Sequence, residues 1–272
     1  MTNFFGKIRH RLLSRNKITK YLMYAIGEII LVVIGILLAL QVNNWNESRK
    51  TREREIKTLK ELQVALQISQ KNLQKLILNN ERWQTYNLKI KDYLENNKPY
   101  DESLDICFGT YFWTGKAQFT TAAYSKLKNE GPDLITNENL RENIIYIFDD
   151  YFNQIKTEHE QWEKDYLAEI IYPEHVKLFR KYFPDSTNVF FDEYAKPVDY
   201  EALLDNQKFV NIISENISLR RYSLAYKKQL VAEIDNLNKM IAAGVQFVVT
   251  TPVFDLHRFQ QVIKRIDTDR VA

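Results

Sequence analysis

Twenty-two residues from Tyr21 to Val42 form a mainly apolar run that contains one charged side chain, Glu28. As an α-helix this run would be roughly 33 Å long, enough to cross a hydrocarbon core of about 30 Å. A buried helix of a soluble protein would keep a polar face, and this run has none. We therefore expect residues 21–42 to form a transmembrane helix.

A cleavable signal peptide is the main alternative, because a basic segment precedes the apolar run. However, the run is longer than the usual 7–15 or so apolar residues of such a peptide. Its end reads LALQV, which is a poor cleavage site because it lacks a clean pair of small residues. We therefore expect the run to be retained as a signal-anchor.

The charges beside the apolar run predict its orientation. Residues 1–20 carry six Lys or Arg and no Asp or Glu, and short basic flanks stay on the cytoplasmic side of a membrane. We expect a single-pass protein of the cell inner membrane, with its N-terminus cytoplasmic and its C-terminal domain extracytoplasmic (periplasmic). Tyr21 and Tyr24 would then be anchors at the inner interface, and Trp45 at the outer one. The tail, FFGKIRHRLL, is either a short amphipathic segment on the anionic inner leaflet or a disordered basic tail.

Glu28 shares one face of the expected helix with Val32, Gly35 and Ala39, at offsets of four, seven and eleven residues. Gly35 and Ala39 form a small-x-x-x-small pair, which lets two helices approach closely. A carboxylate in hydrocarbon must be protonated, partnered or drawn toward the headgroups. Three roles are open: a tolerated acid, a contact with another helix, and a proton or ion pathway. We name the four residues as candidate transmembrane helix-contact residues. Beyond the lipid bilayer, the partner would be a second copy of this chain or a multi-span membrane protein.

A long amphipathic pattern follows the apolar run and predicts a helix from near Ser48 to about Asn96, ended by Pro99. Its seam advances in steps of three and four residues, and eight of its eleven positions are apolar. These positions are Leu59, Leu62, Leu66, Ser69, Leu73, Leu76, Asn80, Trp83, Asn87, Ile90 and Leu94. The seam is typical either of an intermolecular coiled coil or of one helix in an intramolecular bundle.

We favour the bundle, because a second amphipathic pattern of matching length can pack back against the first. Its apolar positions are Phe209, Ile212, Ile213, Leu219, Tyr226, Leu230, Ile234, Leu237 and Ile241. The chain has only 7 Gly and 6 Pro, which suits long helices better than turn-rich sheets. The predicted fold class is therefore all-α.

The expected domain order is a basic cytoplasmic tail at 1–20, a transmembrane helix at 21–42, a long juxtamembrane helix at 43–98, and the rest of a helical extracytoplasmic domain at 99–272.

Four shorter stretches lie outside the two long patterns. The stretch TTAAYSKLKNEGPDLITNENLRENI predicts helix, turn and helix, with Gly131 as a left-handed cap, Pro132 as a stop and Asn137 as the next N-cap. SLDICFGTYFW is either a core helix or a buried strand. YFPDSTNVFFDEYAKPVDY is expected to be irregular, and GVQFVVTTPVF is β-prone, with its strand state left open.

The sequence offers no pattern of residues for catalysis, cofactor binding or metal binding. The histidines, His10, His159, His175 and His257, lie in separate segments without metal-ligand spacing. Cys107 has no CxxC partner or nearby histidine and is expected to be a small core residue. Seven dispersed glycines supply no phosphate-binding loop. We expect no nucleic-acid partner, because the basic tail accounts for the pI of about 8.7.

Two stretches resemble an uncharacterised family of single-span, N-terminally anchored membrane proteins common in Bacteroidota. The first is FFGKIRHRLLSRNKITKYLMYAIGEIILVVIGILLALQVNNWNE, residues 4–47, and the second is TTAAYSKLKNEGPDLITNENLRENI, residues 120–144. The resemblance implies a membrane protein and supplies no catalytic residues. We therefore expect a membrane-anchored protein acting by binding or assembly. The alternatives are an accessory or sensor subunit of a multi-span complex, and a membrane-tethered enzyme.

Overall fold

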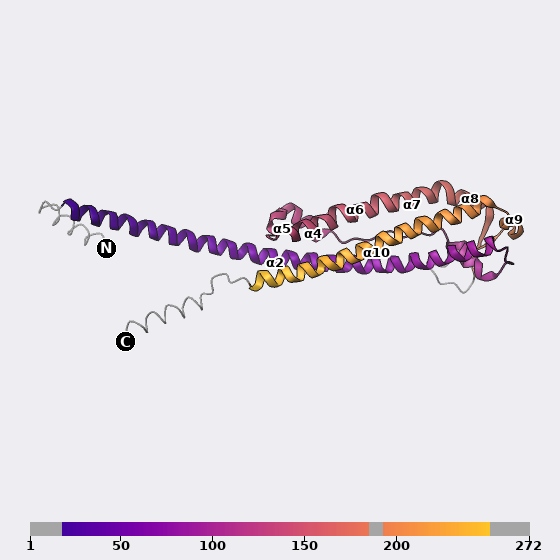
Figure 1. Ribbon diagram of the computed structural model, residues 1–272, viewed down its shortest axis with the longest axis horizontal. Coiled ribbons are helices and arrows are strands. Elements are labelled where there is room, and N and C mark those ends of the chain that lie inside the picture. The colour runs from indigo at the N-terminus through magenta and orange to yellow at the C-terminus, as the bar shows by residue number, and fades with distance from the viewer. Residues whose placement is uncertain (1–17, 185–192, 251–272) are drawn as a thin grey trace, which may run out of the picture. The chain divides into compact units, whose positions relative to one another are not determined.

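The computed structural model describes residues 18–184 and 193–250, which are predominantly helical (Figure 1). The α-helices are α2 (Ile18–Glu95), α3 (Asp105–Thr110), α4 (Ala122–Glu130), α5 (Glu138–Ile145), α6 (Phe152–Gln154), α7 (Glu160–Tyr166), α8 (Tyr172–Leu178), α9 (Tyr200–Leu204) and α10 (Gln207–Thr250). The predicted all-α class is confirmed apart from one two-stranded sheet. The N-terminal amphipathic segment, His10 and His257 lie outside the described residues.

The chain divides into two units, residues 1–54 with 251–272, and residues 55–250. In the first unit, α2 exposes its large apolar side chains from Leu22 to Val42, and none of the most apolar stretch is buried within the protein. Among the described residues α2 is the one helix that is long and apolar enough to cross a membrane. Residues 21–42 are thus a candidate membrane span.

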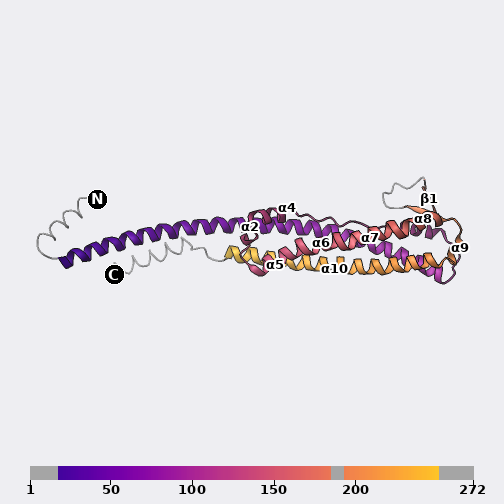
Figure 2. The ribbon, with the colours of Figure 1, turned by 90° about the horizontal axis from the view of Figure 1, so that it is seen from above.

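The second unit is a bundle built on α2 and α10, which run side by side in both ribbon views (Figures 1 and 2). Gln70 Nε2 donates to Val231 O at 3.2 Å, and Gln84 Nε2 donates to Ile217 O at 3.4 Å, so the two helices are antiparallel. All eleven predicted seam positions of α2 are buried within the chain. This burial confirms the bundle over the intermolecular coiled coil for the seam.

The third long component is a helical run from Glu138 to Leu178, in which α5, α6, α7 and α8 alternate with three π-helical segments. These segments are η3 (Tyr146–Tyr151), η4 (Ile155–His159) and η5 (Leu167–Ile171). In each π-helical turn, backbone hydrogen bonds join residues five apart instead of four, so the turn contains an extra residue. The residues after the turn are therefore rotated about the helix axis, and a different set of positions faces the bundle. The run lies along α10 in both ribbon views (Figures 1 and 2).

The predicted turn between helices is confirmed at residues 130–138. Helix α4 ends at Glu130, η2 (Pro132–Leu134) follows, and Asn137 Oδ1 accepts a hydrogen bond from Leu140 N at 2.9 Å as the N-cap of α5. Gly131 has φ 104° and ψ 123°. Its φ is positive as expected, but its ψ is extended rather than that of a left-handed helical cap.

Replacing Gly131 by valine is expected to lower the free energy of unfolding by about 1 kcal/mol or more, because a β-branched residue is strained at positive φ. A Cβ at this position would meet nothing within 4 Å, so the cost comes from the backbone alone. Thermal unfolding of the full chain in detergent measures it. Valine at the neighbouring exposed Glu130 is the control, and an equal loss in both variants would contradict the assignment.

The stretch SLDICFGTYFW forms a core helix as far as Thr110, in η1 (Glu102–Leu104) and α3, and its last three residues follow the helix. The segment expected to be irregular instead contains part of an antiparallel hairpin, β1 (Phe179–Tyr182) with β2 (Tyr194–Pro197), paired from Phe179 with Pro197 to Tyr182 with Tyr194. A Cβ on Gly109 of α3 would lie 1.9 Å from Glu193 O, so glycine permits this close approach. The β-prone stretch at the C-terminal end is helical to Thr250, and residues 251–254 lie outside the described residues.

Candidate functional site

The four candidate helix-contact residues, Glu28, Val32, Gly35 and Ala39, are all exposed on α2. Glu28 and Val32 also line one shallow hollow on the surface of the helix. A Cβ built on Gly35 would meet nothing within 4 Å. The face is therefore open within the first unit, and its role as a contact stays a prediction.

The three expected interface anchors also lie on α2. Tyr24 is exposed, while Tyr21 and Trp45 are half-buried. The guanidinium carbon of Arg49 lies 5.9 Å from the centroid of the Trp45 ring, within the range of a cation–π contact. Their depth in a membrane stays a prediction.

The bundle contains a buried layer of polar side chains that the sequence did not single out as a site. We call it the polar layer; it consists of Asn80, Asn87, Glu163, Asn216, Arg220 and Lys227. Two separate apolar clusters make up the core. One includes Leu59 to Ile77 of α2, and the other includes Ile90 and Leu94. The polar layer thus interrupts the apolar seam of α2 between its two clusters.

Arg220 of α10 is the centre of this layer, with only 3% of its surface exposed. It donates to Asn80 Oδ1 at 3.1 Å, to the carbonyl of Tyr111 at 3.1 Å and to the carbonyl of Trp113 at 2.9 Å. These carbonyls follow α3, where the helix has ended and its last carbonyl groups lack helical partners. Burial lowers the pKa of Arg220 to about 10, and the carboxylate of Glu163 opposes that shift.

Asn87 and Asn216 complete the connection to the loop after α3. Asn216 Nδ2 donates to Asn87 Oδ1 at 2.9 Å and to Tyr111 O at 2.8 Å. Asn87 Nδ2 also donates to Tyr111 O at 2.9 Å. The Tyr111 carbonyl therefore accepts from three side chains on two helices, which fixes the register of α2 and α10 at this level.

The charged half of the layer joins α10 to α7. Lys227 is fully buried, and its Nζ lies 3.6 Å from Glu163 Oε1 and donates to Ser223 Oγ. The neighbouring Glu160 accepts a hydrogen bond from Ala117 N, and burial raises its pKa. The buried ammonium of Lys227 and the carboxylate of Glu163 thus face each other between α10 and α7. Such pairing offsets the cost of removing both charges from water.

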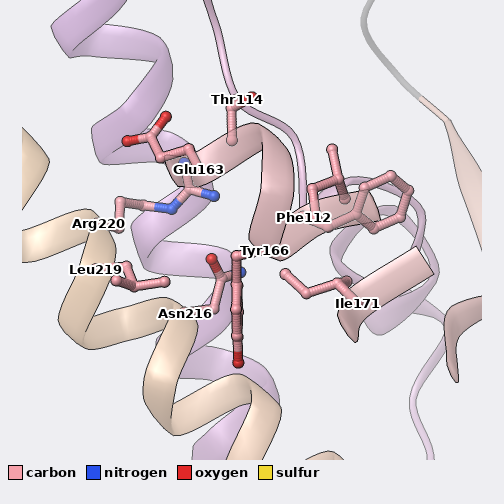
Figure 3. A pocket seen from close by; sticks show the side chains of 9 residues that line it. Phe112, Thr114, Glu163, Tyr166, Ile171, Asn216, Leu219 and Arg220 are labelled. Atoms are coloured by element: carbon pink, nitrogen blue, oxygen red, sulfur yellow. The ribbon is translucent and has the colours of Figure 1, made fainter. Parts of the chain in front are cut away.

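A small cavity lies beside these charges (Figure 3). It offers about 10 Å³ to the centre of a water molecule, close to the minimum for holding one. Its walls come from the loop after α3, α7, η5 and α10: Phe112, Thr114, Glu163, Tyr166, Leu167, Ile171, Asn216, Leu219 and Arg220. The cavity is too small for an ordinary metabolite, whose pockets measure hundreds of cubic ångströms.

Comparison with known proteins assigns the chain to a family. A family model described as a family of unknown function, DUF6090, matches residues 28–217, more than two thirds of the chain. The chain belongs to the DUF6090 family. No curated protein and no solved structure matches it. The DUF6090 match begins at Glu28 and ends before Arg220, so it includes the helix-contact face and part of the polar layer.

The remaining candidate groups of this DUF6090 chain are packed in its core. His175 is 2% exposed and stacks among aromatic rings, with ring centroids 4.6 Å from Phe112 and 5.2 Å from Phe179. Cys107 is buried, its thiol donates to Ser103 O at 3.5 Å, and burial raises its pKa to about 11. In the described ranges, no group of three or more His, Cys, Asp or Glu side chains could hold a metal ion.

Proposed function

We propose that this protein is anchored in a membrane by one helix, residues 21–42, and that its helical bundle acts outside the cytoplasm by binding or assembly. In a bacterium with two membranes this means the inner membrane and the periplasm. One observation carries the anchoring: large apolar side chains in this segment are 47–73% exposed within the protein. They are Leu22, Met23, Tyr24, Ile26, Ile29, Ile30, Leu31, Val32, Val33, Ile34, Ile36, Leu37, Leu38, Leu40 and Val42. A continuous apolar surface of this kind requires lipid or another helix to cover it.

The proposal of binding or assembly, rather than catalysis, rests on how the bundle uses its polar groups. Arg220, Asn216 and Asn87 are held by backbone carbonyls and by one another, and the cavity beside them has room for about one water molecule. Such a layer commonly fixes the register of packed helices, as polar seam residues do in coiled coils. We therefore assign the layer to architecture and the outer surface to function.

A reporter fused after Ala272 is expected to be active only in a form that works outside the cytoplasm. Alkaline phosphatase fused there should be active and β-galactosidase inactive, because the six basic residues of the tail hold the N-terminus inside. Replacing those six residues with glutamine is the matched change, and it should raise the inverted fraction. Activity of the cytoplasmic reporter on the wild-type chain would contradict the orientation.

The second candidate function is that of an accessory or sensor subunit of a multi-span membrane complex. Glu28 favours it, because a carboxylate among apolar exposed residues costs up to about 3 kcal/mol in hydrocarbon unless it finds a partner. Gly35 and Ala39 on the same face allow a second helix to approach that carboxylate. A homo-oligomer would satisfy the same requirement with a second copy of the chain.

Gly35→Leu and Glu28→Leu are each expected to weaken helix association by roughly 0.5–2 kcal/mol, the first by blocking close approach and the second by removing a polar contact. Both should still insert. Crosslinking of the isolated span and co-purification of the full chain in mild detergent measure association.

Leu37 lies on the opposite side of the helix from Glu28, so Leu37→Ile is the control and should leave association unchanged. Undiminished association in both test variants would exclude this face as the contact. In the wild type, a stoichiometric multi-span protein in the co-purified fraction would favour the accessory role, and a homo-oligomer the structural one.

A further inference from the structure

Two buried atoms of charged side chains beside the cavity have no hydrogen-bond partner among the residues that the structure describes. They are Nε of Arg220 and Oε2 of Glu163, and both residues line the cavity. Arg220 is 3% exposed, and the side chain of Glu163 is 10% exposed. A buried donor or acceptor left without a partner destabilises the fold, and the penalty is larger if the group is charged. Such atoms in a native fold call for a ligand that the protein itself does not supply.

The two groups do not satisfy each other directly. No nitrogen of Arg220 lies within 4.0 Å of a Glu163 oxygen, although Glu163 acts electrostatically on Arg220. Figure 3 shows both side chains at the same end of the cavity, with Asn216 below them. A polar pair separated beyond direct bonding distance, with a small cavity beside it, is the usual setting for a bridging water molecule.

The chemistry of the walls selects the class of ligand. A free anion would be attracted by Arg220 but repelled by Glu163, and a free cation the reverse. A neutral molecule that both donates and accepts hydrogen bonds meets neither obstacle. The volume of about 10 Å³ admits water and little else.

We propose that the cavity is a specific binding site for one water molecule, which accepts from Arg220 Nε–H and donates to Glu163 Oε2. Its second hydrogen is directed to the amide oxygen of Asn216, since the amide nitrogen of that residue already donates to Asn87 and Tyr111. With three hydrogen bonds the water has the number typical of buried waters. It links α10 to α7 and so completes the polar layer.

The first test observes the water on the full chain in detergent micelles. With arginine labelled selectively with ¹⁵N, the Nε–H of Arg220 should show a cross-peak to a long-lived water, and the exposed Arg221 should show only rapidly exchanging solvent. Arg220→Lys identifies the resonance by its loss. An assigned Arg220 Nε–H with no cross-peak to a bound water would overturn the proposal.

The second test fills the cavity and measures whether Tm rises or falls. Leu219→Phe places a larger side chain against the site, and Leu219→Met conserves the volume as its control. If water binds there, the phenylalanine should displace it, remove the cross-peak and lower Tm by about 3–6 °C, because two charged atoms lose their partner. Leu219→Met should keep the cross-peak and a Tm within about 2 °C of wild type.

A rise in Tm for Leu219→Phe would overturn the proposal, because filling a dry cavity stabilises a protein. If the phenylalanine variant fails to fold, the cross-peak in the wild type and in Leu219→Met decides the matter.

Discussion

Arg220→Met is expected to lower the free energy of unfolding of the bundle by about 3–5 kcal/mol, the range for removing one member of a buried charged network. The change leaves Asn80 Oδ1 and the carbonyls of Tyr111 and Trp113 without this donor. It also removes a positive charge from beside Glu163. Methionine keeps most of the apolar packing of the side chain, so the loss reports mainly on hydrogen bonds and charge.

Chemical unfolding of the full chain in detergent, followed by circular dichroism, measures this loss. Arg221→Met is the matched control, because Arg221 is exposed on the same helix and surface changes usually alter stability by less than about 0.5 kcal/mol. A loss below about 1 kcal/mol for Arg220→Met, or an equal loss in both variants, would show that the polar layer does not stabilise the bundle.

Acidification from pH 7 to below pH 4 is expected to cost the bundle about 3 kcal/mol through His175 alone. Burial, assisted by the charge of Lys181, lowers the pKa of His175 to about 4, against an ordinary value of 6.5. Between these two values the unfolded chain binds the proton and the folded chain does not, so stability rises with pH across this window. The contribution is fully present above pH 6.5 and is lost as pH falls to 4.

His175→Phe isolates this contribution, because phenylalanine fits the surrounding rings and cannot be protonated. Within residues 18–184 and 193–250, neither ring nitrogen of His175 has a hydrogen-bond partner to lose. The difference in unfolding free energy between wild type and variant should therefore change by about 3 kcal/mol from pH 7 to pH 4. A difference that stays constant with pH would mean that His175 is protonated equally easily in the folded and unfolded chains.

The bundle could be predicted from the sequence because its seams are long and regular. Every position predicted for the seam of α2 is buried, including the polar Ser69, Asn80 and Asn87. Steps of three and four residues place all these positions on one helix face, so they are buried together whether they are polar or apolar.

The polar layer was missed on α10 although its spacing was visible. The buried positions of that helix continue in steps of four and three through the polar residues: Phe209, Ile213, Asn216, Arg220, Ser223, Lys227, Leu230, Ile234, Leu237 and Ile241. Because the seam was expected to be apolar, the four polar positions in the middle of this series, Asn216, Arg220, Ser223 and Lys227, were not assigned to it. Three polar positions in the facing seam of α2 were the signal that matching polar groups would be needed.

Two features lay beyond sequence reasoning for a physical reason. The π segments of residues 138–178 change the number of residues per turn three times, so no single period describes the buried face of that run. Tertiary contacts hold the strands β1 and β2 against α3. Tyr182 donates to the buried carboxylate of Asp105 at 2.7 Å, and Gly109 lets the adjoining chain approach α3.

The burial of Cys107 makes the chain well suited to site-specific chemical labelling. It is the one cysteine in the sequence, and a thiol with a pKa of about 11 is thiolate in only about one molecule in ten thousand at neutral pH. A cysteine introduced at an exposed position would react with maleimides far faster than the native one. Single additions along α2 would then map, with membrane-impermeant reagents, which residues face each aqueous compartment and which face lipid, without first removing the native thiol.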